Sequence, residues 1–225
     1  YSLYAREILC RYTDMVEPFG IDEAWLDVTE SRVLFGEGKT IADDIRAVLR
    51  QELGLTASVG VSFNKTFAKL GSDYKKPDAT TVISRDDFRE IVYPLPANNL
   101  LFIGQVAYET LSRHGIKTIG DIARTDAEIL AALLGKTGEA LRICALGEED
   151  SGVRSAYESG EKAKSIGNGA TFRRDLVGFA DIETGVVALA DTVATRLRTA
   201  GMKCRTIQVI VKDPLLKTVS RQRQL

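Results

Sequence analysis

Two adjacent acids stand between two short apolar runs near the N-terminus, and this arrangement restricts the local fold more than any other feature of the chain. The apolar-rich runs cover residues 15–19 and 24–28, and the segment GIDE, residues 20–23, separates them. A separation of this length suits a tight β-hairpin. Asp22 and Glu23 are then expected at or beside the turn, where neighbouring carboxylates repel one another and require a compensating positive charge.

Strands and helices are expected to alternate over about the first 85 residues, which describes an α/β layer. The boundaries follow from apolar spacing, from residues that cap helices and from the effect of proline on the residue before it. The expected elements, in chain order, are a helix over about residues 40–53 closed by Gly54, a strand over 55–61, a helix capped by Ser62 that ends before Lys76-Pro77, and a strand over 79–84.

Short helices joined by glycines replace this alternation between residues 86 and 150. A helix is expected over about residues 105–114, with Gly104 before it and Gly115 closing it. A second helix begins near Thr118. Free main-chain N–H groups at such a helix start can hold a phosphate. Taken alone, the segment is explained equally well as an ordinary helical hairpin.

Residues 151–163 are polar, glycine-flanked and without periodicity, so we interpret them as a linker. Beyond them we expect a β-α-β-β unit. Its predicted elements are a strand over residues 165–176, an amphipathic helix over 186–199 followed by Gly201, a strand containing Ile207, Val209 and Val211, and a strand within KTVSRQRQL, residues 217–225. In the last strand, Arg221 and Arg223 point to one side and Ser220 to the other, because side chains alternate.

Charge is unevenly distributed along a chain whose net charge is only −1. Residues 161–225 contain twelve Lys and Arg against six Asp and Glu, whereas the first 160 residues carry an excess of seven acids. A basic C-terminal part is typical of binding to an anionic partner, with nucleic acid as the first candidate. A basic face that is merely solvated explains the charge equally well.

Other features of the sequence exclude several classes of protein. Three widely separated cysteines without C-x-x-C spacing indicate neither a zinc site nor a disulfide framework. No apolar run approaches the roughly 18 residues of a membrane span, and we expect no signal peptide. We therefore expect a cytoplasmic protein without a membrane partner. Because Tyr1 already lies in an apparent helix, the sequence is expected to start inside a domain.

Each candidate site residue has a functional and a structural interpretation. Asp22 and Glu23 could hold Mg²⁺, which prefers oxygen ligands and, as two ions about 3.5–4 Å apart, suits phosphoryl transfer. A solvated acidic turn is the alternative. Lys76 could contact a triphosphate or could serve only as a cation at a helix C-terminus. Arg221 and Arg223 could follow a phosphate backbone or could protect a sheet edge from aggregation.

Four stretches of sequence carry a more specific signal. They are EPFGIDEAWLDVTES, ASVGVSFNKTFAKLGSDYKKPDATTVI, KSIGNGATFRRDL and TVSRQRQL. Together they resemble the Y-family, translesion DNA polymerases of the DNA polymerase IV type. The resemblance implies an α/β (α+β) multi-domain fold with a partial palm (residues 1–83), a helical thumb with a helix-hairpin-helix (84–150), the linker (151–163) and a partial β-α-β-β little finger (164–225).

The resemblance also implies an activity for the palm. Asp22 corresponds to a metal-ligand aspartate, and Glu23 to the catalytic acid beside it, which also binds metal. Lys76 corresponds to the lysine that contacts the incoming triphosphate. The implied reaction is template-directed DNA synthesis past damaged bases, in which a primer 3′-hydroxyl attacks the α-phosphate of a dNTP with two Mg²⁺ ions. Implied partners are primer-template DNA, dNTP and, for the full-length protein, a sliding clamp.

Outside the palm, the resemblance implies contacts to DNA. Gly104 belongs to the helix-hairpin-helix that would clamp a phosphate, and Ser220, Arg221 and Arg223 belong to the strand that would grip the DNA backbone. Phe102 departs from the pattern, because some family members carry the first hairpin glycine at this position.

Further departures bear on the activity of the chain. Gly20 stands where a serine is usual, and the family's N-terminal palm aspartate, its fingers domain and the end of its little finger are not among the given residues. With one of three carboxylates missing, we expect the parent protein to be an active polymerase and this chain alone to be inactive. A non-catalytic DNA-binding module is the alternative. A helix-hairpin-helix glycosylase using Lys117 or Asp121 is a third interpretation, although no pocket for a flipped base is recognisable.

Overall fold

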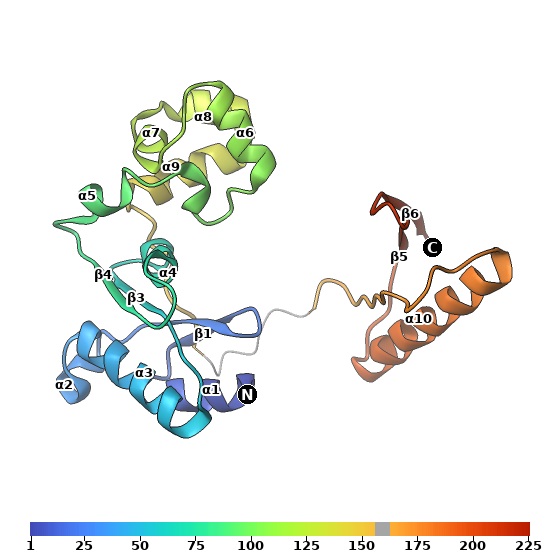
Figure 1. Ribbon diagram of the computed structural model, residues 1–225, viewed down its shortest axis with the longest axis horizontal. Coiled ribbons are helices and arrows are strands. Elements are labelled where there is room, and N and C mark those ends of the chain that lie inside the picture. The colour runs from blue at the N-terminus through green and yellow to red at the C-terminus, as the bar shows by residue number, and fades with distance from the viewer. Residues whose placement is uncertain (156–162) are drawn as a thin grey trace. The chain divides into compact units, whose positions relative to one another are not determined.

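A computed structural model describes residues 1–155 and 163–225 of the protein. The chain divides into two compact units, one up to residue 158 and the other from residue 159 (Figure 1). Within the described ranges, the first unit contains two small sheets and the second contains one. In the same ranges, no helix combines the length and the apolar character needed to cross a membrane.

The first unit begins with alternating helices and strands, as the sequence predicts. β1 and β2 form an antiparallel hairpin, whereas β3 and β4 are parallel and are connected through α4. The strands thus form two separate two-stranded sheets. The elements of this part are α1 (Ser2–Leu9), β1 (Val16–Phe19), β2 (Glu23–Leu26), α2 (Arg32–Phe35), α3 (Gly38–Leu53), β3 (Val59–Ser62), α4 (Lys65–Tyr74) and β4 (Thr80–Ile83).

Successive residues of β3 face α4 and α3 in turn. A Cβ atom on Gly60 would lie 1.8 Å from the carbonyl oxygen of Ala68, so no side chain fits between β3 and α4 at this point. The next residue, Val61, faces α3, where a Cβ on Gly38 would lie 2.9 Å from Val61 Cγ1. Helices therefore cover both faces of β3, which is typical of parallel strands.

Asn64 caps α4, so the predicted cap at Ser62 is wrong. The side-chain oxygen of Asn64 accepts a hydrogen bond from the Phe67 N–H at 2.8 Å. Ser62 still belongs to β3, and its hydroxyl donates to the carbonyl oxygen of Ile83 in β4 at 2.8 Å. Serine and asparagine are both good caps. The contact with β4 keeps Ser62 in the strand.

Short helices follow β4 and complete the first unit. In Figure 1, α6 to α9 gather into one group. The helices expected after Gly104 and from near Thr118 are confirmed. The elements are α5 (Phe88–Val92), the 3₁₀ helix η1 (Ala97–Asn99), α6 (Gln105–Arg113), α7 (Ile119–Arg124), α8 (Ala127–Leu134) and α9 (Lys136–Leu146).

One hydrophobic core continues from α4 and β4 into these helices. The ring centroids of Phe67 and Phe88 lie 5.3 Å apart, and Phe63 contacts both rings at 5.6 and 5.8 Å. The aromatic side chains therefore pack across the expected boundary after residue 83. A second, smaller core joins α1 to α3 and consists of Ile8, Tyr12, Ile41, Ile45 and Leu49.

The second unit contains α10 (Phe179–Thr199) and an antiparallel hairpin of β5 (Thr206–Lys212) and β6 (Thr218–Gln224). These two strands confirm the expected end of the β-α-β-β unit. The expected first strand, over residues 165–176, is wrong, because β5 and β6 are the strands formed in the described part of this unit. A strand needs hydrogen-bonding partners, and Gly167 and Gly169 further weaken strand formation here.

Helix α10 starts seven residues before Val186, where the sequence analysis places its beginning. The earlier start carries the helix through Gly185, which is buried. A Cβ atom there would lie 2.9 Å from Leu176 Cδ1 and 3.0 Å from Phe172 Cζ. Glycine is used at this position for close packing, so it does not break the helix.

The contact of Gly60 with α4 generates a prediction about stability. Gly60→Ala should lower the free energy of unfolding of the first unit by about 3 kcal/mol, because the added methyl group overlaps the Ala68 carbonyl. Gly152→Ala is the matched control, since a Cβ there meets no atom within 4 Å. Urea unfolding followed by circular dichroism measures both variants, and equal midpoints would contradict the close approach.

Candidate active site and nucleic-acid interface

The β1–β2 hairpin places the two adjacent acids where the sequence predicts them. Phe19 pairs with Glu23, so residues 20–22 form the turn and Glu23 begins β2. Gly20 adopts a φ of 80°, in the left-handed region that glycine enters without strain. Asp22 is exposed and makes no hydrogen bond or ion pair to any residue that the structure describes.

Glu23 belongs to a series of ion pairs that runs along α4 to Lys76. Lys69 Nζ lies 3.2 Å from Glu23 Oε1 and also pairs with Asp73. The other carboxylate oxygen of Asp73 lies 2.5 Å from Lys76 Nζ. The structure therefore connects the candidate catalytic acid with the candidate triphosphate lysine.

Lys69 supplies the positive charge that the acidic turn requires. Burial lowers the pKa of Lys69, but hydrogen bonds to Asp73 and Glu23 outweigh burial and raise it above its ordinary value. Burial raises the pKa of Asp73, whereas hydrogen bonds from Lys69 and Lys76 lower it below its ordinary value overall. All these groups of α4 are therefore charged at neutral pH, and Glu23 has a cation beside it.

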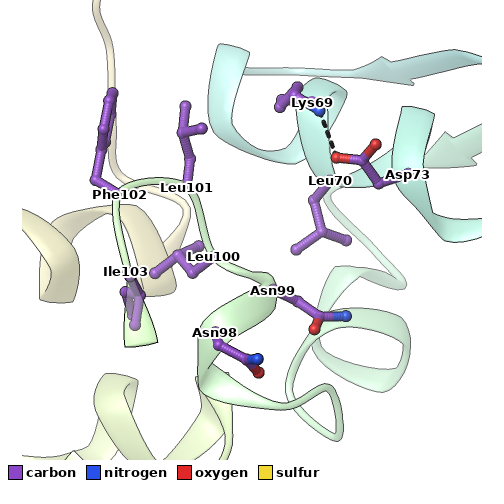
Figure 2. A pocket seen from close by; sticks show the side chains of 10 residues that line it. Lys69, Leu70, Asp73, Asn98, Asn99, Leu100, Leu101, Phe102 and Ile103 are labelled. Atoms are coloured by element: carbon purple, nitrogen blue, oxygen red, sulfur yellow. Dashed lines mark hydrogen bonds and ion pairs between the residues drawn. The ribbon is translucent and has the colours of Figure 1, made fainter. Parts of the chain in front are cut away.

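The sequence analysis did not identify Lys69 or Asp73, which Figure 2 shows paired on α4. Side chains three or four residues apart are neighbours on a helix, so the spacing of Lys69, Asp73 and Lys76 offered a signal. The contact between Lys69 and Glu23 offered none. It depends on how α4 lies against β2, which residue spacing does not reveal.

Asp22 and Glu23 provide hard oxygen ligands of the kind that Mg²⁺ prefers. Within residues 1–155 and 163–225, no three side chains of His, Cys, Asp or Glu gather closely enough to hold a metal ion. Mg²⁺ binds through one or two carboxylates where substrate phosphates and water complete its coordination. The two acids therefore fit a site that a nucleotide helps to form, and do not fit a site formed by these residues alone.

A third carboxylate on the same hairpin, that of Glu17, is buried and fully paired. Lys65 Nζ donates to it at 2.5 Å, and Arg154 donates its backbone N–H at 2.9 Å and its guanidinium at 3.0 Å. Burial raises the pKa of Glu17, but these hydrogen bonds lower it to about 2. Lys65 Nζ also lies 5.4 Å from the ring centre of Trp25, which is favourable for a cation–π contact.

Arg154 fixes the start of the predicted linker, residues 151–163, to β1. Ser155 adds a hydrogen bond from its hydroxyl to the carbonyl oxygen of Asp14 at 3.2 Å. Residues 156–162 of the predicted linker lie outside the described residues. The linker assignment therefore stays a prediction, although its first residues are held on the hairpin.

The two helices that flank Gly115 have well-defined ends. Gly104 is the N-cap of α6, and Gly115, with a φ of 80°, reverses the chain after it. Thr118 begins α7 through a capping box with Asp121. Binding of a phosphate at Gly104 stays a prediction.

The carboxylate of Asp121 makes hydrogen bonds and an ion pair within the first turns of α7 and the residues before it. It accepts the backbone N–H groups of Thr118 and Lys117 at 2.9 and 3.1 Å, and it pairs with Arg124 at 2.9 Å. Burial raises the pKa of Asp121, but these hydrogen bonds lower it to about 2. Such an acid is a poor proton acceptor at neutral pH. The structure thus gives no support to a glycosylase in which Asp121 acts on the substrate.

Phe102 stands where the resemblance implies a hairpin glycine in some family members. Its φ is 72°, in the left-handed region, and 71% of the residue is exposed. This conformation costs a residue other than glycine roughly 1–2 kcal/mol. A large apolar side chain is therefore held in solvent by a strained backbone, immediately before the start of α6.

The β5–β6 hairpin presents the two candidate arginines on one face. Arg221 pairs with Val209 and Arg223 with Ile207, and residues that pair in this way share a face of the sheet. Both arginines are exposed. Ser220 lies on the opposite face, so the structure brings the arginines together and separates Ser220 from them.

Comparison of the sequence with known proteins identifies the family to which the chain belongs. The sequence profile of the impB/mucB/samB family matches residues 1–73, and the profile of its C-terminal domain matches residues 163–225. The chain belongs to this family of Y-family DNA polymerases. DNA polymerase IV of Acetivibrio thermocellus is 47% identical over 222 residues, which are 99% of this chain and 55% of the relative.

Other Y-family polymerases agree with this assignment. DNA polymerase IV of Moorella thermoacetica is 38% identical over 225 residues, covering 100% of this chain and 56% of the relative. The chain therefore spans about half the length of the curated relatives it matches. The solved Y-family DNA polymerase chimera Dbh-Dpo4(243-245)-Dbh superposes with a TM-score of 0.81 at 23% identity, over 100% of this chain and 63% of that one. This likeness shows a Y-family polymerase fold, a mixed α/β fold with small sheets.

The pairing of Glu17 predicts a pH-dependent contribution to stability. Its pKa falls from an ordinary 4.5 to about 2 on folding. At about 1.4 kcal/mol per pKa unit, Glu17→Gln should lower the free energy of unfolding at pH 7 by about 3 kcal/mol. Because the native pKa is depressed, this contribution is complete above pH 4.5 and is lost as the pH falls toward 2.

Urea unfolding of the wild type and of Glu17→Gln at pH 7, 4 and 3 measures this contribution. The difference between the two proteins should shrink as the pH falls. The exposed Glu30→Gln serves as the control and should match the wild type throughout. A constant difference between Glu17→Gln and the wild type down to pH 3 would contradict the assignment.

Proposed function

We propose that the full protein containing these residues is a DNA polymerase that copies templates past damaged bases. The observation that carries this proposal is the series of ion pairs from Glu23 through Lys69 and Asp73 to Lys76. Nucleotidyl transfer needs acids that hold metal ions close to a cation that binds a triphosphate, and this arrangement provides both. The two curated relatives described above carry the name DNA polymerase IV, which supports the same reaction.

The proposal assigns a task to each part of the chain. The acid-bearing hairpin and α4 support a palm, the paired helices α6 and α7 support a thumb that holds DNA, and the basic C-terminal residues support a DNA-gripping domain. The proposed parts are a partial palm (residues 1–83), a thumb (84–150), a linker (151–163) and a partial little finger (164–225).

In the proposed reaction, Asp22 and Glu23 would hold the metal ions through their carboxylate oxygens. Two Mg²⁺ ions, when bound, would favour the ionised primer 3′-hydroxyl and stabilise charge on the phosphates. The 3′-oxygen, its proton passed to water, would form a bond to the α-phosphorus of the dNTP as the bond to the leaving diphosphate breaks. Lys76 would neutralise charge on the triphosphate. Lys69 pairs with both Glu23 and Asp73, so its charge would remain compensated by Asp73 where Glu23 serves as a metal ligand.

DNA contacts in the proposal come from two places. The main-chain N–H groups after Gly104, at the start of α6, would bind a phosphate. Arg221 and Arg223, exposed on one face of β6, would bind other phosphates of the DNA. Ser220 faces the other way, so it is proposed to contact DNA only through its backbone.

Binding to DNA without catalysis is the second function for the 225 residues taken alone. The twelve basic residues after residue 160 favour it. The family resemblance implies three metal-binding carboxylates, and Asp22 and Glu23 provide two of them. We therefore propose that this chain alone binds primer-template without extending it. Primer extension by the isolated chain above the background of Glu23→Gln would overturn this proposal.

Substitutions in the full-length protein test the catalytic roles. Glu23→Gln should lower kcat about 100-fold or more, because a metal ligand needed in the transition state is weakened. Lys76→Ala should raise KM for the nucleotide about tenfold, because a contact with the triphosphate is lost. Single-nucleotide incorporation on an undamaged primer-template measures both effects.

Lys75→Ala is the matched control for Lys76→Ala. Lys75 is the adjacent exposed lysine, and it makes no ion pair within the described part of the chain. The KM of the Lys75→Ala variant for the nucleotide should equal that of the wild type. Undiminished incorporation by Glu23→Gln would remove the catalytic assignment, and equal KM values for the two lysine variants would remove the assignment of Lys76.

The salt dependence of DNA binding tests the arginines. Each phosphate neutralised contributes about 0.9 to the slope of log K against log salt. Arg221→Gln and Arg223→Gln should therefore each reduce the slope for the 225-residue chain by about 0.9. Arg6→Gln, at a partly exposed position of α1, removes the same charge and should leave the slope unchanged. Slopes that do not differ among the three variants would show that β6 does not contact phosphates.

A further inference from the structure

Lys76, the candidate triphosphate lysine, lies just beyond the C-terminal end of α4. The helix ends at Tyr74 and Lys75 is its C-cap, so Lys76 lies outside the helix. Pro77 follows and cannot continue a helix. The Nζ atom of Lys76 lies 2.5 Å from Asp73 Oδ1, but 51% of its side chain is exposed. A contact from outside α4 is therefore needed to set the position of the backbone at Lys76.

Asp78 provides this contact two residues later, because two arginines of α3 hold it. Arg46 Nη2 donates to the backbone carbonyl oxygen of Asp78 at 2.5 Å and to its carboxylate oxygen Oδ1 at 2.9 Å. Arg50 pairs with the other carboxylate oxygen of Asp78. Both the main chain and the side chain of Asp78 are therefore attached to α3.

Arg46 contacts two further segments at the same time. Its Nε donates to the carbonyl oxygen of Ala57 at 3.2 Å, and its Nη1 donates to the hydroxyl of Thr80 at 3.1 Å. All three guanidinium nitrogens thus have acceptors, and the side chain is only 21% exposed. A planar guanidinium with donors in a fixed geometry is well suited to hold several segments together.

The backbone of Asp78 needs such support. Its φ is 54°, in the left-handed region, which costs energy for residues other than glycine although aspartate tolerates it better than most. The next residue, Ala79, accepts a hydrogen bond from the Val59 N–H at 2.8 Å and so joins the chain to β3. The contacts of Arg46 therefore stabilise an unfavourable turn between Lys76 and the parallel sheet.

We propose that Arg46, acting through Asp78, positions Lys76 to meet the triphosphate of the incoming nucleotide. Arg46 and Asp78 are positioning residues and are assigned no contact with the nucleotide. The inference rests on the proposed function, because that function assigns the triphosphate contact to Lys76. A lysine whose backbone is already fixed loses less conformational freedom when it binds. The contact between Arg46 and Asp78 should therefore lower the KM for the nucleotide and leave kcat nearly unchanged.

Substitutions of Arg46 and Asp78 in the full-length protein test this inference. Arg46→Gln and Asp78→Ala should each raise the KM for the nucleotide about fivefold, with kcat within about twofold of the wild type. In Arg46→Gln, Arg50 still compensates the charge of Asp78. Asp78→Asn keeps an oxygen that accepts from Arg46 and tolerates the left-handed region, so its KM should stay close to that of the wild type. Wild-type KM values for both Arg46→Gln and Asp78→Ala would overturn the inference.

Glu52→Ala is the matched control for Asp78→Ala. Glu52 lies on α3, and its two carboxylate oxygens accept from Arg11 at 2.6 and 2.8 Å. Because this ion pair does not involve the segment after α4, its loss should leave the KM for the nucleotide unchanged. An equal rise in KM for Glu52→Ala and Asp78→Ala would show a general effect of lost ion pairs and would overturn the positioning role.

A double-mutant cycle shows whether the effect passes through Lys76. In a protein that carries Lys76→Ala there is no lysine to position, so adding Asp78→Ala should not raise the KM for the nucleotide further. If the two increases instead multiply in the double variant, Asp78 acts by another route and the inference fails.

Hydrogen exchange of the 225-residue chain tests the ordering of this segment without any nucleotide. In Arg46→Gln, the amides of residues 74–80 should exchange about threefold faster or more, because the segment opens more easily. The amides of α6 should exchange at the wild-type rate. Equal acceleration in both places, or acceleration in neither, would overturn the inference.

The outcomes distinguish this inference from the proposed function. A raised KM for Lys76→Ala, together with wild-type KM values for Arg46→Gln and Asp78→Ala, would remove the positioning role and leave the assignment of Lys76 standing. A wild-type KM for Lys76→Ala would remove that assignment and the inference with it.

Discussion

The close approach of β3 and α4 is the constraint on which the rest of the structure depends. At Gly60 the strand and helix backbones come so near that no side chain fits between them. This contact fixes the position of α4 against β3. From α4, Lys65 reaches Glu17 of the hairpin, and one helical turn later Lys69 reaches Glu23. One helix, held on β3 by this packing contact, therefore supplies both the buried ion pair to the hairpin and the ion pair at the candidate site.

The two glutamates of the hairpin differ in burial, and this difference separates a residue that stabilises the fold from a residue that can bind a ligand. The side chain of Glu17 is 9% exposed and is paired with Lys65 and Arg154, so removal of a partner would leave a buried charge uncompensated. Glu23 is 36% exposed and lies 3.2 Å from Lys69, a longer contact. Water and ions can reach Glu23, and its lysine can be exchanged for another cation. This difference supports Glu23, and not Glu17, as a metal ligand.

Sequence signals predicted the elements that depend on neighbouring residues, and they failed where distant parts of the chain decide. The acidic hairpin and the helices around Gly115 follow from local turn and capping chemistry. The cap of α4 was predicted wrongly, because a hydrogen bond to Ile83 of β4 keeps Ser62 in the sheet. The start of α10 was also predicted wrongly, because Gly185 packs against Phe172 and Leu176 of the preceding segment, and the apolar spacing of residues 186–199 does not contain that contact. The contact between Lys69 and Glu23 joins a helix to a separate hairpin, so no local pattern contains it.

The aromatic rings that cross from α4 to α5 have a mechanical consequence. Phe63, Phe67 and Phe88 interlock with ring centres 5.3 to 5.8 Å apart, which leaves little freedom for a hinge between the sheet and the helices that follow. Helices α6 to α9 and α4 should then move together as one body. In the polymerase proposed above, a distorted duplex that displaces those helices would also displace α4. The distance between Lys69 and Glu23 would then change, so the rate of the proposed reaction would depend on the shape of the duplex.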